Sequence, residues 1–156
     1  MTEGTPAPVL ELEDVLHRLD DSRQRLMDSL AECKAEHFDA EAVDSESIKR
    51  TLERTVDDLN FYYGRLVARA MSLPQPPCME TADFMSMREA VMSLQVAHRR
   101  FSNLLHDLIP ADLDREAVDA EHGSYTMRQL LEMSAAHYDV RTQQVNRIAA
   151  ETPRSS

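Results

Sequence analysis

Four stretches of the sequence place apolar residues at three- and four-residue steps, and this spacing constrains the fold most strongly. An α-helix turns once every 3.6 residues, so residues at these steps lie on one face of a helix. None of the four stretches shows the alternation of apolar and polar residues that indicates a half-buried strand. The pattern predicts an all-α protein.

The first two predicted helices have clear ends. The first follows a loose tail and ends near His37. The second begins at Ser45 or Ser47, whose hydroxyl can cap the helix, and the prolines at 74, 76 and 77 prevent its continuation. The apolar faces consist of Leu12, Val15, Leu16, Leu19, Leu26, Leu30 and Cys33 in the first helix, and Ile48, Leu52, Val56, Leu59, Tyr63 and Leu66 in the second.

The third predicted helix stops at Pro110, and the fourth begins at Ser124 or Thr126 and runs to Pro153. The acidic segment 110–126 contains Gly123, and we expect it to be a long ordered loop. The apolar face of the third helix consists of Phe84, Met87, Val91, Leu94, Phe101, Leu105 and Leu108.

The chain of 156 residues can bury one core without disulfides or metal ions. We expect a flexible tail at residues 1–8, one four-helix bundle of the up-and-down type at residues 9–152, and a tail at residues 153–156. The net charge of −11 argues against binding to nucleic acid or to an anionic membrane surface. The opening "MTEGTPAPV" lacks the features of a signal peptide, and we expect a cytoplasmic protein.

Two segments carry a resemblance to a known family. The run "ESIKRTLER" at residues 46–54 opens the second predicted helix, and "TMRQLLEMSAAHYDVR" at residues 126–141 opens the fourth. Both resemble the corresponding segments of DinB-like (DinB/YfiT-like) four-helix bundles. The resemblance implies a central site in which one histidine of the second helix and a His-x-x-x-His pair of the fourth bind a divalent cation.

Carried onto this sequence, the three metal-ligand positions are Arg54, His137 and Arg141. A guanidinium group has no free lone pair at ordinary pH, so neither arginine can bind a cation. The metal site of the family is therefore degenerate here. We expect a metal-free protein without enzymatic activity and assign no catalytic residue.

Three interpretations of this centre remain open. In the first, Arg54, His137 and Arg141 converge in the cleft between the second and fourth helices and bind a small anionic ligand, a carboxylate or phosphate. In the second, the centre is a closed ion-pair network that serves only structure or oligomerisation. Arg54 and Asp58 are then i, i+4 partners, and Arg141 pairs with Asp57 or Asp58 across the bundle.

In the third interpretation, Asp57, Asp58 and His137 form a rebuilt site for a divalent metal such as zinc or nickel. The resemblance then implies a metal-dependent thiol S-transferase or hydrolase with non-standard ligands. It also implies that a homodimer is plausible. A small molecule remains the expected partner in the first and third interpretations.

Other aromatic and imidazole side chains complete the candidates. Phe61, Tyr62 and Tyr63 are consecutive, so at least one ring must leave the apolar face and line the central cleft or a subunit interface. His98 and His106 share a face of the third helix but lie about 12 Å apart along its axis, which is too far for one ion. We expect the histidines at 17, 37 and 122 at the surface or at helix ends.

Overall fold

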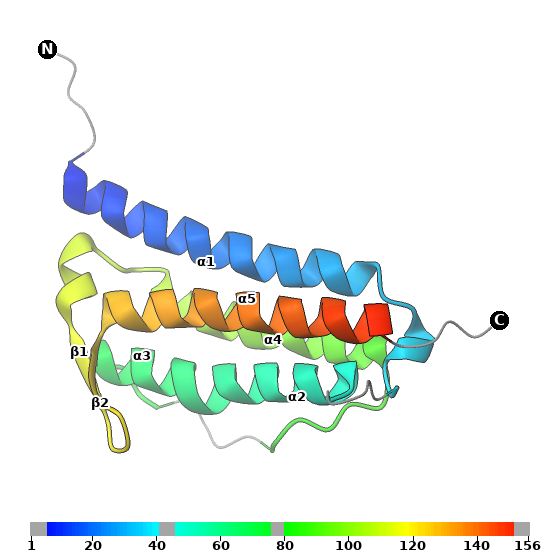
Figure 1. The fold of residues 1–156 in the computed structure, drawn as a ribbon. Helices are drawn as coiled ribbons and strands as arrows, with labels where there is room; N and C mark the ends of the chain where they lie inside the picture. Colours follow the sequence, from blue (N-terminus) through cyan, green and yellow to red (C-terminus); the bar gives the residue numbers. More distant parts are fainter. Residues whose placement is uncertain (1–5, 41–45, 76–79, 152–156) are drawn as a thin grey trace, which may run out of the picture.

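The computed structural model describes residues 6–40, 46–75 and 80–151, and within these ranges it is dominated by four long helical rods (Figure 1). The second rod is continuous but contains a turn of π-helix, η2. The rods are α1 (Ala7–Ala31), the run of α2 (Ile48–Asp58), η2 (Leu59–Tyr63) and α3 (Gly64–Ala70), then α4 (Met87–Leu105) and α5 (Met127–Glu151). The mainly helical prediction is confirmed at this level.

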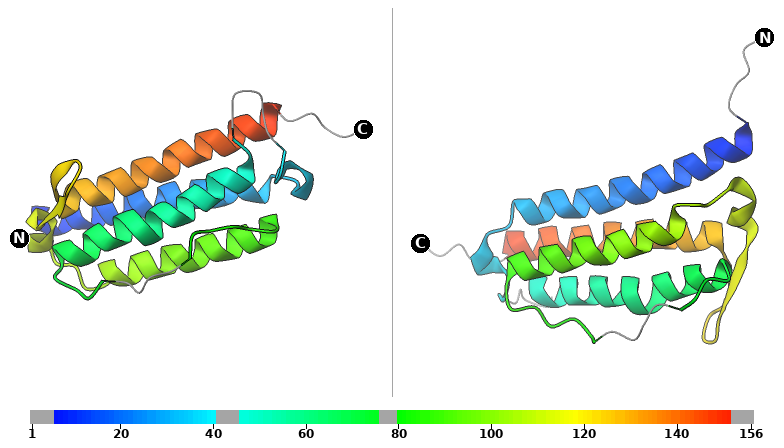
Figure 2. Two further views of the ribbon diagram at one scale, coloured as in Figure 1. Left: turned by 90° about the horizontal axis from the view of Figure 1, so that it is seen from below. Right: turned by 180° about the vertical axis from the view of Figure 1, so that it is seen from behind.

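The helices pack as a bundle in which α5 lies between α1 and the α2–α3 rod, with α4 behind it (Figures 1 and 2). The α2–α3 rod and α4 run in the same direction. Lys49 at the start of α2 donates a hydrogen bond at 2.8 Å to Asp83 and another at 2.9 Å to the carbonyl of Phe84, both just before α4. The expected up-and-down order is therefore wrong, because the segment after α3 returns along the bundle before α4 begins.

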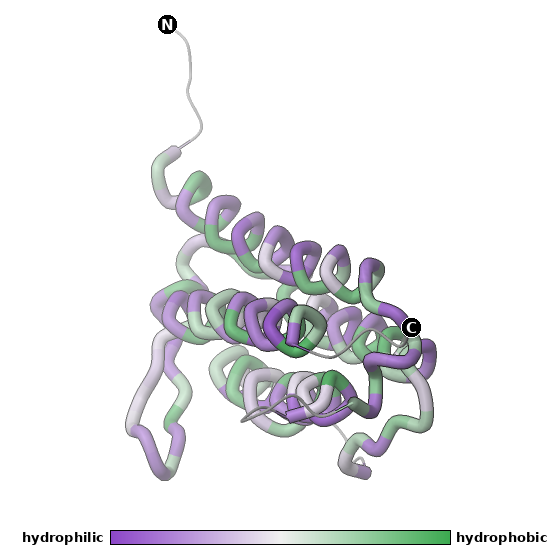
Figure 3. Tube along the Cα trace, turned by 45° about the vertical axis from the view of Figure 1, so that its right-hand side comes forward, coloured by the Kyte–Doolittle hydropathy of each residue, from purple (hydrophilic) through white to green (hydrophobic). Residues whose placement is uncertain are grey.

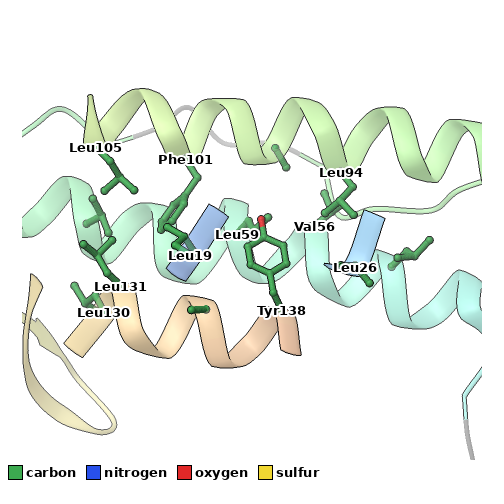
Figure 4. Packing of buried hydrophobic residues seen from close by; sticks show 14 of the residues in the cluster. Leu19, Leu26, Val56, Leu59, Leu94, Phe101, Leu105, Leu130, Leu131 and Tyr138 are labelled. Carbon is green, nitrogen blue, oxygen red and sulfur yellow. The ribbon is translucent and has the colours of Figure 1, made fainter. Parts of the chain in front are cut away.

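The core lies where the four predicted apolar faces meet (Figure 3). Fourteen of the predicted stripe residues are buried there: Leu12, Val15, Leu19, Leu26, Leu30, Ile48, Leu52, Val56, Leu59, Leu66, Phe84, Leu94, Phe101 and Leu105. In Figure 4, Tyr138 reaches from α5 into this core. None of the helices in the described ranges is both long and apolar enough to cross a membrane.

Side-chain caps fix the starts of three rods, and in α4 the Ser86 hydroxyl accepts the backbone N–H of Glu89 at 3.2 Å. The Ser47 hydroxyl accepts the backbone N–H of Arg50 at 3.1 Å, and the Thr126 hydroxyl accepts that of Gln129 at 3.1 Å. The Gln129 side chain in turn accepts the N–H of Thr126 at 2.9 Å, which completes a capping box. Ser47 and Thr126 are thus the observed caps, whereas Ser45 lies outside the described residues.

The two ends of the first predicted helix differ from expectation. Pro6 occupies the N-cap position of α1, and Ala7 and Pro8 already belong to the helix, because proline suits a first turn whose N–H groups have no partner within the helix. The helix ends at Ala31, and His37 lies in a separate 3₁₀ turn, η1 (Ala35–His37). His37 is buried there and is the last residue of this turn, so of the two expected positions, the surface or a helix end, the second is observed. Residues 1–5 and 152–156 lie outside the described ranges.

The expected loop before the fourth helix contains regular structure. It forms a 3₁₀ turn, η3 (Pro110–Asp114), and an antiparallel hairpin of β1 (Glu116–Asp119) and β2 (Gly123–Thr126). Gly123 has φ 92°, a left-handed conformation that glycine adopts without strain, and it lets the chain turn into β2. Arg69 in α3 donates a hydrogen bond at 2.6 Å to the carbonyl of Val118 and so attaches the hairpin to the bundle.

Candidate functional site

Two of the predicted helices bring three of the five candidate residues together. Asp58 is the last residue of α2, and His137 and Arg141 lie one turn apart on α5. The Nη2 atom of Arg141 donates a hydrogen bond at 3.1 Å to Oδ2 of Asp58. The Nε2 atom of His137 lies 3.6 Å from the same oxygen. The predicted pairing of Arg141 with an acid across the bundle is confirmed for Asp58.

The π-helical turn η2 places aromatic rings beside this cluster. The turn needs a glycine after it, because a Cβ atom at Gly64 would lie 2.6 Å from the carbonyl oxygen of Leu59. The Tyr63 ring lies 5.3 Å from that of His137, between ring centres. The neighbouring Tyr62 donates a hydrogen bond at 2.7 Å to Asp119 of the hairpin. Single π turns of this kind occur frequently at functional sites.

A cleft of about 420 Å³ opens next to the cluster. The α2–α3 rod, the hairpin and α5 all contribute to its walls. The lining residues are Asp58, Tyr62, Tyr63, His122, Tyr125 and Met133. The cleft therefore has aromatic walls and one carboxylate, that of Asp58, which also belongs to the cluster. The hairpin residues His122 and Tyr125 belong to it.

The electrostatics of the cluster follow from its burial. The side chain of His137 is 10% exposed, and burial, reinforced by the neighbouring charge of Arg141, lowers its pKa to about 4 against the opposing effect of Asp58. His137 is therefore neutral at pH 7. Burial and the Asp58 charge raise the pKa of Tyr63, so its hydroxyl keeps its proton. The Arg141 guanidinium and the Asp58 carboxylate carry the two opposite charges of the cluster.

Two polar atoms of the cluster are buried without a hydrogen-bond partner among the described residues. They are Nε2 of His137 and Nε of Arg141. The other end of the guanidinium is occupied, because Nη1 donates at 3.0 Å to the side chain of Gln144. An unsatisfied buried polar group costs about 1–3 kcal/mol. The cluster thus has unused hydrogen-bonding capacity at its centre.

The other two candidates do not join this cluster. The guanidinium of Arg54 is half exposed and forms its ion pair with Glu46, not with Asp58. Asp57 lies about 100° around the helix from Asp58. Its carboxylate accepts the backbone N–H of Ala82 at 2.8 Å. Burial raises the pKa of Asp57, and the hydrogen bond from Ala82 partly offsets this.

This arrangement corrects two sequence-based hypotheses. Arg54 does not converge with His137 and Arg141, because its long side chain turns toward an acid that precedes α2. Asp57 is directed to the segment before α4, away from His137, so the two do not form the rebuilt metal site. Over residues 6–40, 46–75 and 80–151, no three His, Cys, Asp or Glu side chains are grouped closely enough to hold a metal ion.

Sequence reasoning missed the contributions of the hairpin and of Gln144. The strands have four residues each, which is too short for a convincing alternation. Gln144 follows Arg141 by three residues, and this helical spacing alone could have identified the contact. The run of consecutive aromatic residues indicated that at least one ring leaves the apolar face, and Tyr62 and Tyr63 both line the cleft.

Comparisons with known proteins provide no family assignment for this chain. No protein-family model matches it, and no curated protein matches it significantly. The resemblance to DinB-like bundles therefore stays a prediction.

Proposed function

We propose that this chain is a DinB-like bundle that binds a small anionic ligand, without a metal ion, at the cluster of Asp58, His137 and Arg141. One observation carries the proposal. Nε2 of His137 and Nε of Arg141 are buried one turn apart on α5 and have no hydrogen-bond partner among the described residues, and Nε2 lies 3.6 Å from Oδ2 of Asp58. An anionic oxygen is the group that satisfies donors of this kind, and hydrogen bonds to a charged guanidinium are stronger than neutral ones.

The unpaired atoms favour a ligand over a closed ion-pair network. In a closed network each buried donor has an acceptor, because an unmade hydrogen bond is costly. Here Nη2 of the Arg141 guanidinium donates a hydrogen bond to Asp58, and Nη1 donates one to Gln144. The third nitrogen of the guanidinium, Nε, has no hydrogen-bond partner among the described residues. In the tautomer with the proton on Nε2, His137 supplies a second donor, and Tyr63 lines the neighbouring cleft.

Asp58 serves as an internal counter-ion in the ligand-free protein. Its side chain is 42% exposed, whereas the Arg141 side chain is only 13% exposed. The carboxylate of Asp58 can therefore turn toward water at small cost, while the guanidinium stays inside. A ligand carboxylate would take the place of the Asp58 carboxylate, so that the buried positive charge is paired before and after binding. The tyrosine walls of the cleft suit an apolar or aromatic body on the ligand.

Calorimetric titration with acetate, benzoate and phosphate at pH 6 tests the proposal. We expect benzoate to bind once per chain, because the tyrosine walls of the cleft suit its ring, and Arg141→Gln to abolish this binding. Arg54→Gln also removes one positive charge, but outside the cluster, and we expect this variant to bind the anion as tightly as the wild type does. Equal weakening in both variants would show that only overall charge matters, and an absence of binding by all three anions would refute the proposal.

A parallel measurement addresses the metal-dependent alternative. Metal content is determined by mass spectrometry on protein purified without chelator or histidine tag, followed by titration with zinc and nickel. Stoichiometric metal that disappears in His137→Ala would favour a thiol transferase or hydrolase with unusual ligands. Anion binding that persists after treatment with a chelator would support the metal-free site.

A further inference from the structure

The Asp58 carboxylate belongs both to the cluster with Arg141 and to the tyrosine-lined cleft beside it. In the ligand-free protein it accepts a hydrogen bond at 3.1 Å from Nη2 of Arg141. A ligand carboxylate that replaces Asp58 at Arg141 leaves the negative charge of Asp58 without its partner. A ligand that also carries a positive charge, placed in the cleft, restores the pairing of that charge.

The walls of the cleft are suited to a cation. Three of the four tyrosines of the chain line it, Tyr62 and Tyr63 of η2 and Tyr125 of β2. The rings of Tyr62 and Tyr63 lie 5.0 Å apart between centres and are nearly perpendicular, at 81°. The hairpin that carries Tyr125 lies beside the α2–α3 rod, to which Arg69 attaches it (Figure 1). Several aromatic rings around one space form the cages that bind quaternary ammonium groups.

The charges around the cleft act in the same direction. Neither lysine nor arginine is among the lining residues of the described structure, whereas Asp58 is. The Tyr62 hydroxyl donates a hydrogen bond at 2.7 Å to Asp119. Burial and this hydrogen bond raise the pKa of Tyr62, so the hydroxyl keeps its proton. Donation to a carboxylate makes the ring richer in electrons, and such a ring attracts a cation more strongly.

The space for the cation adjoins the buried donors of the anion site. The Tyr63 ring lies 5.3 Å from the His137 ring, between centres. Nε2 of His137 and Nε of Arg141 are the buried nitrogens without a hydrogen-bond partner among the described residues. Asp58 contacts Arg141 and also lines the cleft, so it stands between the two parts of the site. A ligand with its two charges only a few bonds apart therefore reaches both parts.

We propose that the ligand of this site is a zwitterion of the betaine class, with one carboxylate and one quaternary ammonium group. The carboxylate binds Arg141 and His137, which rests on the function proposed above. The methylated ammonium lies among the tyrosines beside Asp58. A primary ammonium fits this cleft less well, because it needs three hydrogen-bond acceptors and the lining offers one carboxylate.

Glycine betaine and 3,3-dimethylbutyrate test the proposal, because they have the same shape and differ in the charge of the trimethyl group. His122 is the basic side chain of the described lining, so the calorimetry is done at pH 8, where an ordinary imidazole is neutral. We expect the wild type to bind glycine betaine about tenfold more tightly than 3,3-dimethylbutyrate. Arg141→Gln should abolish the binding of both ligands.

Tyr125→Leu and its matched control isolate the contribution of the cage. Tyr125→Leu should remove most of the preference for glycine betaine, while the affinity for 3,3-dimethylbutyrate changes by less than about threefold. Phe61→Leu removes a ring of the same rod that is not part of the cleft lining, and should retain the full preference. Neither substitution alters the charge of the protein, so a preference caused by net charge alone would persist in both.

The failure of this inference and that of the proposed function give different results. Equal affinity for the two ligands, or a preference that persists in Tyr125→Leu, would refute the tyrosine cage and leave the anion site standing. Binding of tetramethylammonium without binding of any carboxylate would refute the proposed function and retain the cage. No binding of glycine betaine, 3,3-dimethylbutyrate or tetramethylammonium would overturn both.

Discussion

Acidification from pH 7 to pH 5 should destabilise the fold through two buried histidines. The pKa values of His98 and His137 are both lowered from 6.5 to about 4, in each case mainly by burial. In this pH range the unfolded chain takes up a proton on each imidazole, whereas the folded chain does not. Stability is therefore lost as pH falls from the ordinary histidine pKa toward 4. Each imidazole contributes a loss of about 2 kcal/mol between pH 7 and pH 5.

The assay is urea unfolding of the wild type, His98→Gln, His137→Gln and the exposed control His122→Gln at both pH values. The quantity compared is the difference in unfolding free energy between pH 7 and pH 5 within one protein, so a constant loss of stability in a variant cancels. We expect each buried-site variant to reduce that difference by about 2 kcal/mol. A difference as large in His137→Gln as in the wild type would refute the neutral, buried state of this imidazole.

Two further substitutions test how the site is positioned. Gly64→Ala should destabilise by about 1–3 kcal/mol in urea unfolding, because its Cβ would meet the Leu59 carbonyl oxygen at 2.6 Å, and unchanged stability would contradict the close approach at the π turn. Thr126→Ala should cost about 1 kcal/mol through loss of the α5 cap, whereas Thr126→Ser should restore most of it, and equal losses in both variants would contradict the capping role.

The sequence was sufficient for features that depend on local spacing. The apolar stripes identified buried residues such as Leu26 and Leu52, because helical periodicity directly reports the face that is removed from water. Cap chemistry gave two candidate starts for each of two helices, Ser45 or Ser47 for α2 and Ser124 or Thr126 for α5, and the observed caps are Ser47 and Thr126. The pairing of Asp58 with Arg141 was among the expected alternatives. All three features follow from residue type and offset alone.

Features that depend on competition between partners could not be predicted in the same way. Arg54 had two acids within reach, Asp58 and Glu46, and exposed ion pairs differ by only about 1 kcal/mol or less, so sequence does not decide between them. The hairpin at residues 116–126 and the parallel course of α2 and α4 depend on tertiary contacts of Arg69 and Lys49. The homodimer and the cytoplasmic location stay predictions.

The most direct test of the central claim is the affinity of one small carboxylate, benzoate, for the wild type, Arg141→Gln and Arg141→Lys at pH 6. The account predicts binding by the wild type, none by Arg141→Gln, and much weaker binding by Arg141→Lys, because an ammonium group lacks the Nε donor that is unpaired in the cluster. Benzoate binding of equal strength in all three proteins would contradict the account, because the unpaired guanidinium nitrogen would then have no part in recognition.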